Sequence, residues 1–279
     1  MFATILIWSD IFAYLRAKSI IYREKVNSDR AIESPNLPCM FSLFIHIYHQ
    51  DAWENIFKKQ LMMLKEYQPR IIINLCMTRS ENSRLICTIK SDFPGTLVIT
   101  TPNKGRDIGG KLASIDFFLK AELQSDYIVL LHDKQSHGSF GGEVWRQKLF
   151  DIIDPAKIET ILEKFKQNSL TGIVGKNDFI RDEYDKRTHL FKTTNNLKLQ
   201  ELILRYKLKI TDYRFVAGTM FWIRTSIIQR FFSVYSPLIC RELLEEGNFS
   251  DHQEGTYTHS WERIFCWLAN DQGYTIKGI

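Results

Sequence analysis

The chain has 279 residues, of which 44% are hydrophobic and 25% are charged, and its formal net charge is +5 at pH 7. This composition is that of a globular protein with enough apolar residues for a full core, and it predicts one large domain with at most a small appendage. The mild basicity favours anionic partners. We expect no nucleic-acid partner, because the sequence has no zinc-finger spacing, no RNP-like strand and no concentrated basic stripe.

The five cysteines are scattered along the chain and include no Cys-x-x-Cys pair. An odd, scattered set argues against a disulfide scaffold and against a structural zinc site. Such cysteines fit a reducing compartment best, so we expect a cytoplasmic protein.

The N-terminal segment 1–25 has apolar residues at helical spacing, whereas residues 26–38 are polar, contain two prolines and indicate a linker. We therefore expect an N-terminal helix and linker over 1–38 and one domain over 39–279. The helix lacks the basic start of a signal peptide, and no window of about 18 apolar residues predicts a transmembrane span. Two alternatives stay open for this helix: peripheral contact with the cytoplasmic face of the inner membrane, or packing on the domain or on another subunit.

In chain order, apolar runs alternate with helical patterns and predict a β-α-β-α-β-α-β unit in the first half. The expected strands are 40–48, 70–77, 96–103 and 126–134, and the expected helices are 51–67, 81–93 and 111–123. The second half is less regular, with expected helices over 154–168, 195–208, 226–235 and 256–272, expected strands over 171–175 and 215–225, and a loop over 245–255. This order predicts an α/β fold of Rossmann type with a mixed, mostly parallel sheet and helices on both faces. No Gly-x-Gly-x-x-Gly pattern follows the first strand, so we expect no dinucleotide cofactor.

The third expected strand runs into the segment Asn103-Lys-Gly-Arg-Asp-Ile-Gly-Gly110. Ligands of open α/β sheets bind at the carboxyl ends of the strands, and glycines there let the backbone approach a ligand closely. Arg106 can hold a diphosphate with paired hydrogen bonds, while Asp107 can accept hydrogen bonds from base or sugar hydroxyls. The alternative is a tight turn with an Arg–Asp pair on the surface.

The fourth expected strand ends in His132-Asp133-Lys134. A carboxylate at this place can hold a divalent metal such as Mg²⁺ or Mn²⁺, but Asp133 stands alone and hard cations take several oxygen ligands. Lys134 or His132 can instead offset the charge of a diphosphate without a metal. A further alternative is that Asp133 only caps the turn that follows.

Near the C-terminus, Glu254 precedes Gly-Thr and an expected helix that carries His259, Glu262 and Arg263. Residues three and four apart share a helix face, so His259 lies on the same side as Glu262 and Arg263. A carboxylate at the start of a helix is well placed to take a proton from a hydroxyl group, and His259 is the rival base. The alternative for Glu262 and Arg263 is an ion pair of the scaffold.

Five segments in consistent order resemble the rhamnan synthesis protein F family of bacterial polysaccharide glycosyltransferases. They are NKGRDIG at 103–109, LHDKQS at 131–136, Trp145-Arg146, GTMFWIR at 218–224 and EGTYTHSWER at 254–263. The resemblance covers roughly residues 40–275. This chain has Glu254 where the family usually has Asp, so the carboxylate is kept but the side chain is one methylene longer.

The resemblance implies a GT-A-like domain that moves a sugar from a nucleotide-sugar donor, for example UDP-galactofuranose or dTDP-rhamnose, with inversion. The acceptor would be a lipid-linked glycan of O-antigen or another surface polysaccharide, and other polysaccharide-synthesis subunits are possible partners. Glu254 would be the general base, with His259 and Asp133 as further catalytic candidates. The implied donor-binding residues are Asn103, Lys104, Gly105, Arg106, Asp107, His132, Lys134 and Arg146. The implied acceptor or sugar contacts are Trp145, Trp222, Glu262 and Arg263, and the alternative for Trp222 is a place in a core strand.

Two other functions stay open. The first is a non-catalytic nucleotide- or glycan-binding module of the same fold, which the missing second carboxylate after the fourth strand motivates. The second is a phosphoesterase built on His132, Asp133, His137 and His259, which is weaker because these residues lack a metal-ligand spacing.

Overall fold

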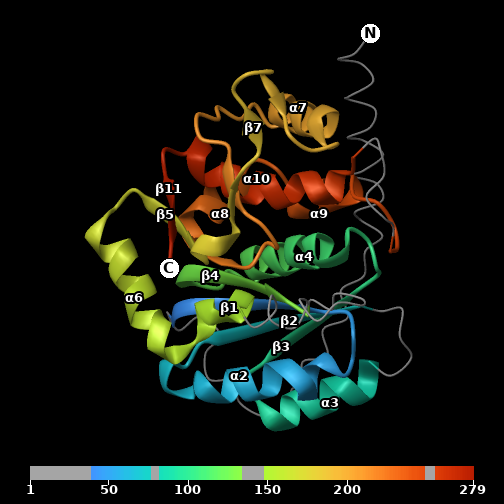
Figure 1. The fold of residues 1–279 in the computed structure, drawn as a ribbon. Coiled ribbons are helices and arrows are strands. Elements are labelled where there is room, and N and C mark those ends of the chain that lie inside the picture. Colours follow the sequence, from blue (N-terminus) through green and yellow to red (C-terminus); the bar gives the residue numbers. More distant parts are fainter. Residues whose placement is uncertain (1–38, 77–81, 134–147, 249–254) are drawn as a thin grey trace.

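The computed structural model describes residues 39–76, 82–133, 148–248 and 255–279, so the expected N-terminal helix and linker lie outside the described residues. The core of the fold is a seven-stranded sheet with the order β11-β5-β10-β4-β1-β2-β3 (Figure 1). In this sheet only β10 runs antiparallel to its neighbours. The expected α/β class with a mixed, mostly parallel sheet is therefore confirmed.

The first half of the chain supplies four parallel strands close to their expected positions. They are β1 (Cys39–Ile47), β2 (Arg70–Cys76), β3 (Leu97–Thr101) and β4 (Ser125–His132). These strands read as continuous apolar runs because both faces of the sheet are covered, as in other parallel sheets. The register places His46 opposite Asn74 on one side and opposite His132 on the other, so polar residues meet at the carboxyl edge.

Helices cover both faces of this sheet. The expected helix 51–67 is broken into a π-helical turn (Trp53–Phe57), α2 (Lys58–Met63) and a 3₁₀ turn (Lys65–Tyr67), followed along the chain by α3 (Asn82–Asp92). Figure 1 shows α2 and α3 on one face of the sheet and α4 (Arg106–Lys120) on the other. Two helices of the second half, α8 (Thr225–Phe232) and α10 (Tyr257–Asp271), lie on the α4 side.

The second half completes the sheet with short strands. A 3₁₀ turn (Asp151–Ile153) and α6 (Pro155–Gln167) lead to β5 (Thr171–Gly175), and β11 (Thr275–Gly278) pairs with β5 at the edge. Beyond β5 lie a 3₁₀ turn (Asn177–Phe179), β6 (Ile180–Asp182), β7 (Tyr184–Asp185), β8 (Leu190–Phe191) and α7 (Asn196–Arg205). The short helix α9 (Pro237–Glu242) and the short strands β6, β7, β8 and β11 were not expected, because two to six residues carry too little periodicity to predict an element.

The expected strand 215–225 is wrong as a single element. It divides into β9 (Arg214–Val216), which pairs with β6, and β10 (Phe221–Arg224), which lies between β4 and β5. Gly218 and Thr219 lie between the two, with φ angles of 86° and 52°. A left-handed backbone at two consecutive residues turns the chain, so an apolar run that reads as one strand becomes two.

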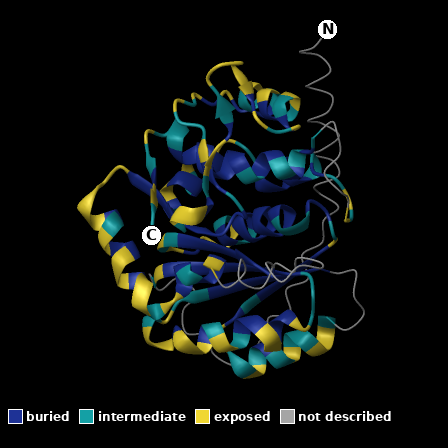
Figure 2. Cartoon of the chain, viewed as in Figure 1, coloured by how far each residue is buried: buried dark blue, intermediate teal, exposed yellow. Residues whose placement is uncertain are grey.

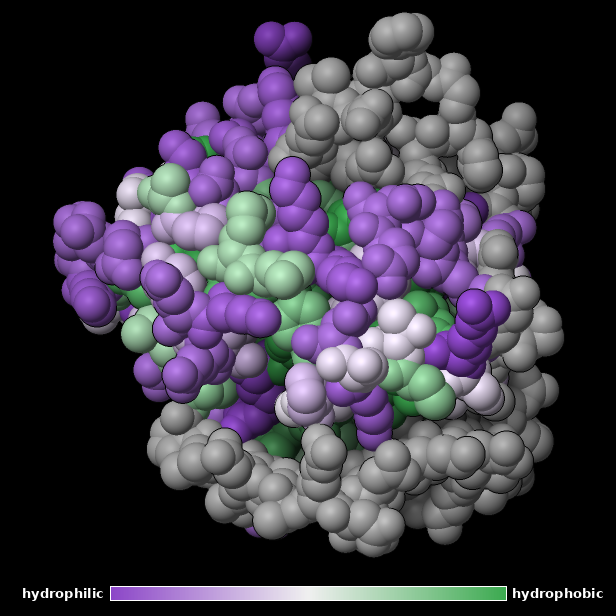
Figure 3. Space-filling view, turned by 90° about the horizontal axis from the view of Figure 1, so that it is seen from below, coloured by the Kyte–Doolittle hydropathy of each residue, from purple (hydrophilic) through white to green (hydrophobic). Residues whose placement is uncertain are grey.

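Burial follows these layers. The sheet, α4 and α10 are largely buried, whereas exposed residues gather on the outer helices (Figure 2). Seen from below, the described surface is mostly hydrophilic, with smaller hydrophobic areas between the polar side chains (Figure 3). Among the described residues, no helix has the length and apolar character needed to span a bilayer.

Candidate functional site

Polar side chains lie together at the carboxyl edge of the parallel strands. His46 of β1 contacts Asn74 of β2 at 2.9 Å between Nδ1 and Oδ1, and Asn74 donates from Nδ2 to Thr101 of β3 at 3.0 Å. All three are buried, and burial lowers the pKa of His46. Sequence reasoning missed these residues, although each is a polar residue at the end of an apolar run, which is the signal that could have found them.

The 103–110 segment opens a helix instead of forming the tight turn that was the alternative. α4 begins at Arg106, five residues earlier than expected, and Gly105 and Arg106 have φ angles of 69° and 50°. Gly110 packs so closely on the strands that a Cβ there would lie 2.1 Å from Nδ1 of His46. The glycines of this segment therefore permit close helix–sheet packing at the edge of the candidate site.

Asp107 and His132 meet around a buried lysine that sequence reasoning missed. The ammonium of Lys111 donates to Oδ2 of Asp107 at 2.7 Å and to the carbonyl oxygen of Thr219 at 2.8 Å, and it lies 3.1 Å from Nδ1 of His132. Burial alone would raise the pKa of Asp107, but the charge of Lys111 and its hydrogen bond outweigh it and hold that pKa far below its ordinary value. Asp107 is thus an anion in the folded protein, and its charge is balanced within the site.

The segment that follows α9 joins the two sequence motifs. Lys104 Nζ lies 3.5 Å from Glu242 and from Glu246, and the Gly105 amide donates to the Glu245 carbonyl oxygen at 2.7 Å. The Glu245 side chain accepts hydrogen bonds from the first amides of α10, at 2.6 Å from Tyr257. Lys104 and Gly105 therefore hold the start of α4 to the start of α10, and they are not among the residues that line the pocket described below.

Asn103 belongs to the same connection. Its side-chain amide donates to Oδ1 of Asn248 at 3.1 Å, and Asn248 donates in turn to the Tyr48 hydroxyl at 3.0 Å. The expected donor-binding role of Asn103 has no contact in the pocket to support it.

α10 presents His259 and Glu262 on one face, as their spacing predicts. Thr256 caps the helix, with its Oγ1 2.6 Å from Nδ1 of His259. Glu262 accepts a hydrogen bond from the Gly218 amide at 2.6 Å and pairs with Arg263 at 2.5 Å. The Glu262–Arg263 ion pair expected as the alternative is thus present.

Arg263 faces the scaffold. Its guanidinium lies 3.1 Å from Glu183 Oε2 and 4.4 Å from the centre of the Phe215 ring. The side chain is buried and does not line the pocket, so the structure gives no support to a sugar contact by Arg263.

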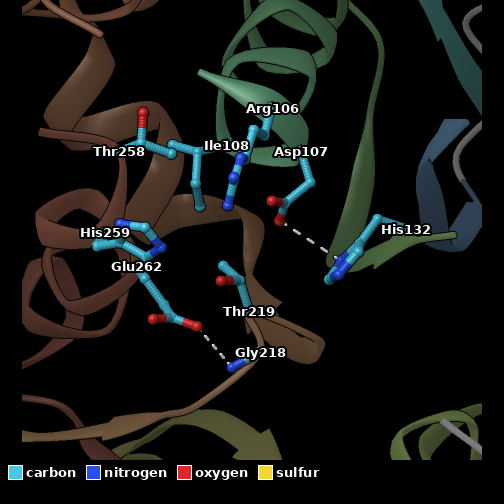
Figure 4. A pocket seen from close by; sticks show the side chains of 9 residues that line it. All are labelled: Arg106, Asp107, Ile108, His132, Gly218, Thr219, Thr258, His259 and Glu262. Atoms are coloured by element: carbon cyan, nitrogen blue, oxygen red, sulfur yellow. Dashed lines mark hydrogen bonds and ion pairs between the residues drawn. The ribbon is translucent and has the colours of Figure 1, made fainter. Parts of the chain in front are cut away.

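A pocket of about 90 Å³ lies between the starts of α4 and α10 (Figure 4). Arg106, Asp107, Ile108 and His132 form one side. Gly218, Thr219, Thr258, His259 and Glu262 form the other. Figure 4 shows the carboxylate of Glu262 and the imidazole of His259 across the pocket from Asp107. The pocket is smaller than the roughly 300–1,000 Å³ of a whole small-molecule site, so the described residues can enclose only part of a nucleotide sugar.

The described residues do not fit a divalent metal site. The Asp133 side chain is 3% exposed, and its Oδ2 accepts the Tyr48 amide at 2.9 Å, the His49 amide at 2.5 Å and a contact from the His49 ring at 3.2 Å. No group of three His, Cys, Asp or Glu residues in the described part of the chain could hold a metal ion. Asp133 therefore positions the loop after β1 instead of the turn that follows it, and these contacts give no support to its expected catalytic and metal-binding roles.

Trp222 is a core residue. It has no exposed surface, its indole donates to the Ile152 carbonyl oxygen at 2.8 Å, and its ring packs 4.6 Å from that of Phe41. A ring with no accessible face cannot stack on a sugar, so the expected sugar contact is wrong and the core-strand alternative is right.

Four expected site residues lie outside the described residues: Lys134, Trp145, Arg146 and Glu254. The chain re-enters the described part at Gly255, where φ is 66° and a Cβ would lie 2.6 Å from Asn195. The next amide, that of Thr256, donates to Oδ1 of Asn195 at 2.8 Å. The residue that follows Glu254 is therefore held against the start of α7.

Comparison with known proteins places the chain in one family. The family described as rhamnan synthesis protein F matches residues 2–274. Two relatives, both described as uncharacterized protein WxcX and both from strains of Xanthomonas campestris pv. campestris, are 25% identical over 188 residues. The alignment covers 63% of this chain but 24% of each relative, so the chain spans about a quarter of their length.

Among solved structures, the mannosyltransferase PcManGT from Pyrobaculum calidifontis, in complex with GDP-Man and Mn²⁺, is similar at a TM-score of 0.39 and 11% sequence identity. The match covers 99% of this chain and 64% of that one. A likeness of this size is too weak to support a conclusion on the fold or on the function.

Proposed function

The chain belongs to the rhamnan synthesis protein F family, and on that premise we propose that it is a glycosyltransferase of bacterial surface-polysaccharide synthesis. The observation that supports this most directly is the pocket, because it brings Arg106 and Asp107 of the first motif together with His259 and Glu262 of the last one. These segments are about 150 residues apart in the chain. The proposal assigns the pocket to part of a nucleotide-sugar donor, for example UDP-galactofuranose or dTDP-rhamnose.

In the proposed reaction a hydroxyl group of a lipid-linked glycan attacks the anomeric carbon of the donor. The bond between that carbon and the diphosphate breaks, and the nucleoside diphosphate leaves with the bonding electrons. Glu254 takes the hydroxyl proton while the hydroxyl attacks from the face opposite the diphosphate, and this single displacement inverts the anomeric carbon. His259, whose Nδ1 is held by Thr256, is the rival base. Glu254 is assigned as the base from its place at the start of the segment EGTYTHSWER, residues 254–263.

Arg106 is proposed to stabilise the leaving diphosphate, since it lines the pocket at the first turn of α4. The amide groups of a helix N-terminus carry partial positive charge, and a guanidinium pairs with phosphate oxygens. Stabilisation of such developing charge is usually a large part of the barrier reduction. Lys134, Trp145 and Arg146 stay predicted contacts of the donor and the acceptor. The proposed reaction includes no metal-dependent step, because the described residues offer no set of metal ligands.

The direct test is turnover with a panel of sugar nucleotides of the UDP and dTDP classes and a lipid-linked acceptor. Glu254→Gln should lower the turnover number by orders of magnitude and leave donor affinity nearly unchanged, because the amide keeps the shape but cannot take the proton. Glu159→Gln, on the exposed side of α6, is the matched control and should behave like the wild type. If the protein binds no donor and shows no turnover with any donor–acceptor pair, the result would count against the proposal.

A second candidate is a non-catalytic nucleotide- or glycan-binding module. The contacts of Asp133 at the end of β4 favour this function, because its carboxylate accepts two backbone amides of the protein in place of a ligand. Donor binding without turnover in the wild type, with every acceptor of the panel, would select this function.

We further propose that the protein works at the cytoplasmic face of the inner membrane, where a lipid-linked acceptor would be reached, together with other polysaccharide-synthesis subunits. A donor-dependent transfer to acceptor in membrane vesicles, and none to the same glycan without its lipid, would support this placement.

A further inference from the structure

Lys111 is a charged side chain in the interior of the site, with 1% of its side chain exposed. Three acceptors surround its ammonium: Asp107 Oδ2 at 2.7 Å, the Thr219 carbonyl oxygen at 2.8 Å and His132 Nδ1 at 3.1 Å. An ammonium has N–H donors and no acceptor, so each of these contacts uses a lone pair of the partner atom. A carboxylate and a carbonyl can only accept, which leaves the histidine as the partner whose state the lysine can decide.

We propose that Lys111 fixes His132 as a neutral imidazole with an unprotonated Nδ1 and the proton on Nε2. A contact between an ammonium and Nδ1 requires the nitrogen lone pair, because a proton on Nδ1 would point at the protons of Lys111. The same Nδ1 lies 3.5 Å from Oδ2 of Asp107. Without the lysine, this carboxylate would attract a proton to Nδ1 and turn His132 into an imidazolium. Lys111 is therefore a positioning residue that selects between two states of one histidine.

The choice of state determines what His132 offers to a ligand. His132 lines the pocket beside Arg106 and the first turn of α4. A neutral ring with its proton on Nε2 donates a hydrogen bond from that nitrogen, and it neither takes a proton there nor binds a metal there. The ligand atom that this suits is an acceptor oxygen, and a phosphoryl oxygen of the donor is the one we assign. That last assignment rests on the proposed function, whereas the state of His132 does not.

The state of His132 can be measured in the protein without any ligand, so failure here is distinguishable from failure of the proposed function. The chain holds seven histidines, and ¹⁵N-histidine labelling with long-range ¹H–¹⁵N spectra at pH 7 reports the protonation of each ring nitrogen. His132→Gln removes one set of signals and so identifies the set of His132. We expect an unprotonated Nδ1 and a protonated Nε2; an imidazolium, or a proton on Nδ1, would overturn the proposal.

Two variants test the cause. Lys111→Met should bring a proton to Nδ1, so that His132 gives the spectrum of an imidazolium paired with Asp107. Lys120→Met is the matched control, because Lys120 also pairs with the aspartate four residues earlier, Asp116 at 2.8 Å, but its side chain is 63% exposed. It should leave the His132 signals unchanged.

Removal of Lys111 alone leaves Asp107 without its main partner and could prevent folding. The double variant Lys111→Met with Asp107→Asn carries no unpaired charge at this place, so it keeps the test possible. With neither the lysine nor the carboxylate present, the fraction of His132 with a proton on Nδ1 should rise above that of the wild type. If the double variant held Nε2–H to the same extent as the wild type, Lys111 would not be the cause.

Discussion

Gly109→Ala should destabilise the protein, although the same change in an ordinary helix interior stabilises by about 1 kcal/mol. A Cβ at position 109 would lie 1.7 Å from the carbonyl oxygen of Lys104 and 2.8 Å from its carbonyl carbon. These are backbone atoms, so no side chain can rotate away, and the start of α4 would have to move. Overpacking costs about 1–3 kcal/mol and sometimes more. With a contact this short we take about 3 kcal/mol, less the helix propensity gained, which leaves a net loss of about 2 kcal/mol.

Thermal unfolding measures this directly. For chains of about this size 1 kcal/mol shifts Tm by about 2–4 °C, so Gly109→Ala should lower Tm by about 4–8 °C. The matched control is Gly95→Ala, where a Cβ would have no atom within 4 Å, and its Tm should stay equal or rise slightly. A Gly109→Ala protein as stable as the wild type would show that α4 does not pack on residue 104 as described, and the close-packing account of the glycines would fail.

Three further outcomes follow from single contacts. Lys111 lowers the folded-state pKa of Asp107, so this carboxylate contributes stability that is complete above its unfolded pKa of about 4 and is lost as the pH falls below it. In urea unfolding at pH 3 to 7, Asp107→Asn should therefore reduce the loss of unfolding free energy on the acid side. Glu245→Ala should cost about 1–2 kcal/mol in the same assay, because its carboxylate caps α10, and equality with wild type would refute the cap. Burial raises the pKa of Cys266 to about 12, so a thiol reagent at pH 8 should modify the exposed Cys87 rapidly and Cys266 only after unfolding.

Much of the fold is readable from the sequence. The four parallel strands and most helices appear where apolar periodicity predicts them, because burial on both faces of a sheet requires long apolar runs. The departures occur where local geometry overrides that pattern. The turn at Gly218 and Thr219 splits one apolar run into β9 and β10. α4 begins at Arg106, beside the left-handed backbone of Gly105, and so before the first residue of the apolar helical pattern.

The candidate site divides in the same way. The motif residues Arg106, Asp107, His132, His259 and Glu262 are assembled in one pocket, as their positions at strand and helix ends suggest. Burial decides against two others: Trp222 packs in the core, and Asp133 binds the backbone of the loop after β1. Neither result is visible from composition or spacing, since an apolar strand residue and a strand-end aspartate look the same in sequence whether they face a ligand or the interior.

The sequence by itself determines the α/β class, the order of the main elements and the family, because these depend on periodicity and on motifs that are local in the chain. Only the tertiary structure decides which charges meet. Lys111 follows Asp107 by one helical turn, yet its contacts with His132 and Thr219 join residues 21 and 108 positions away. Such contacts depend on how α4 docks on the strand edge, and that docking is set by the shape of the packed core, which no local pattern records.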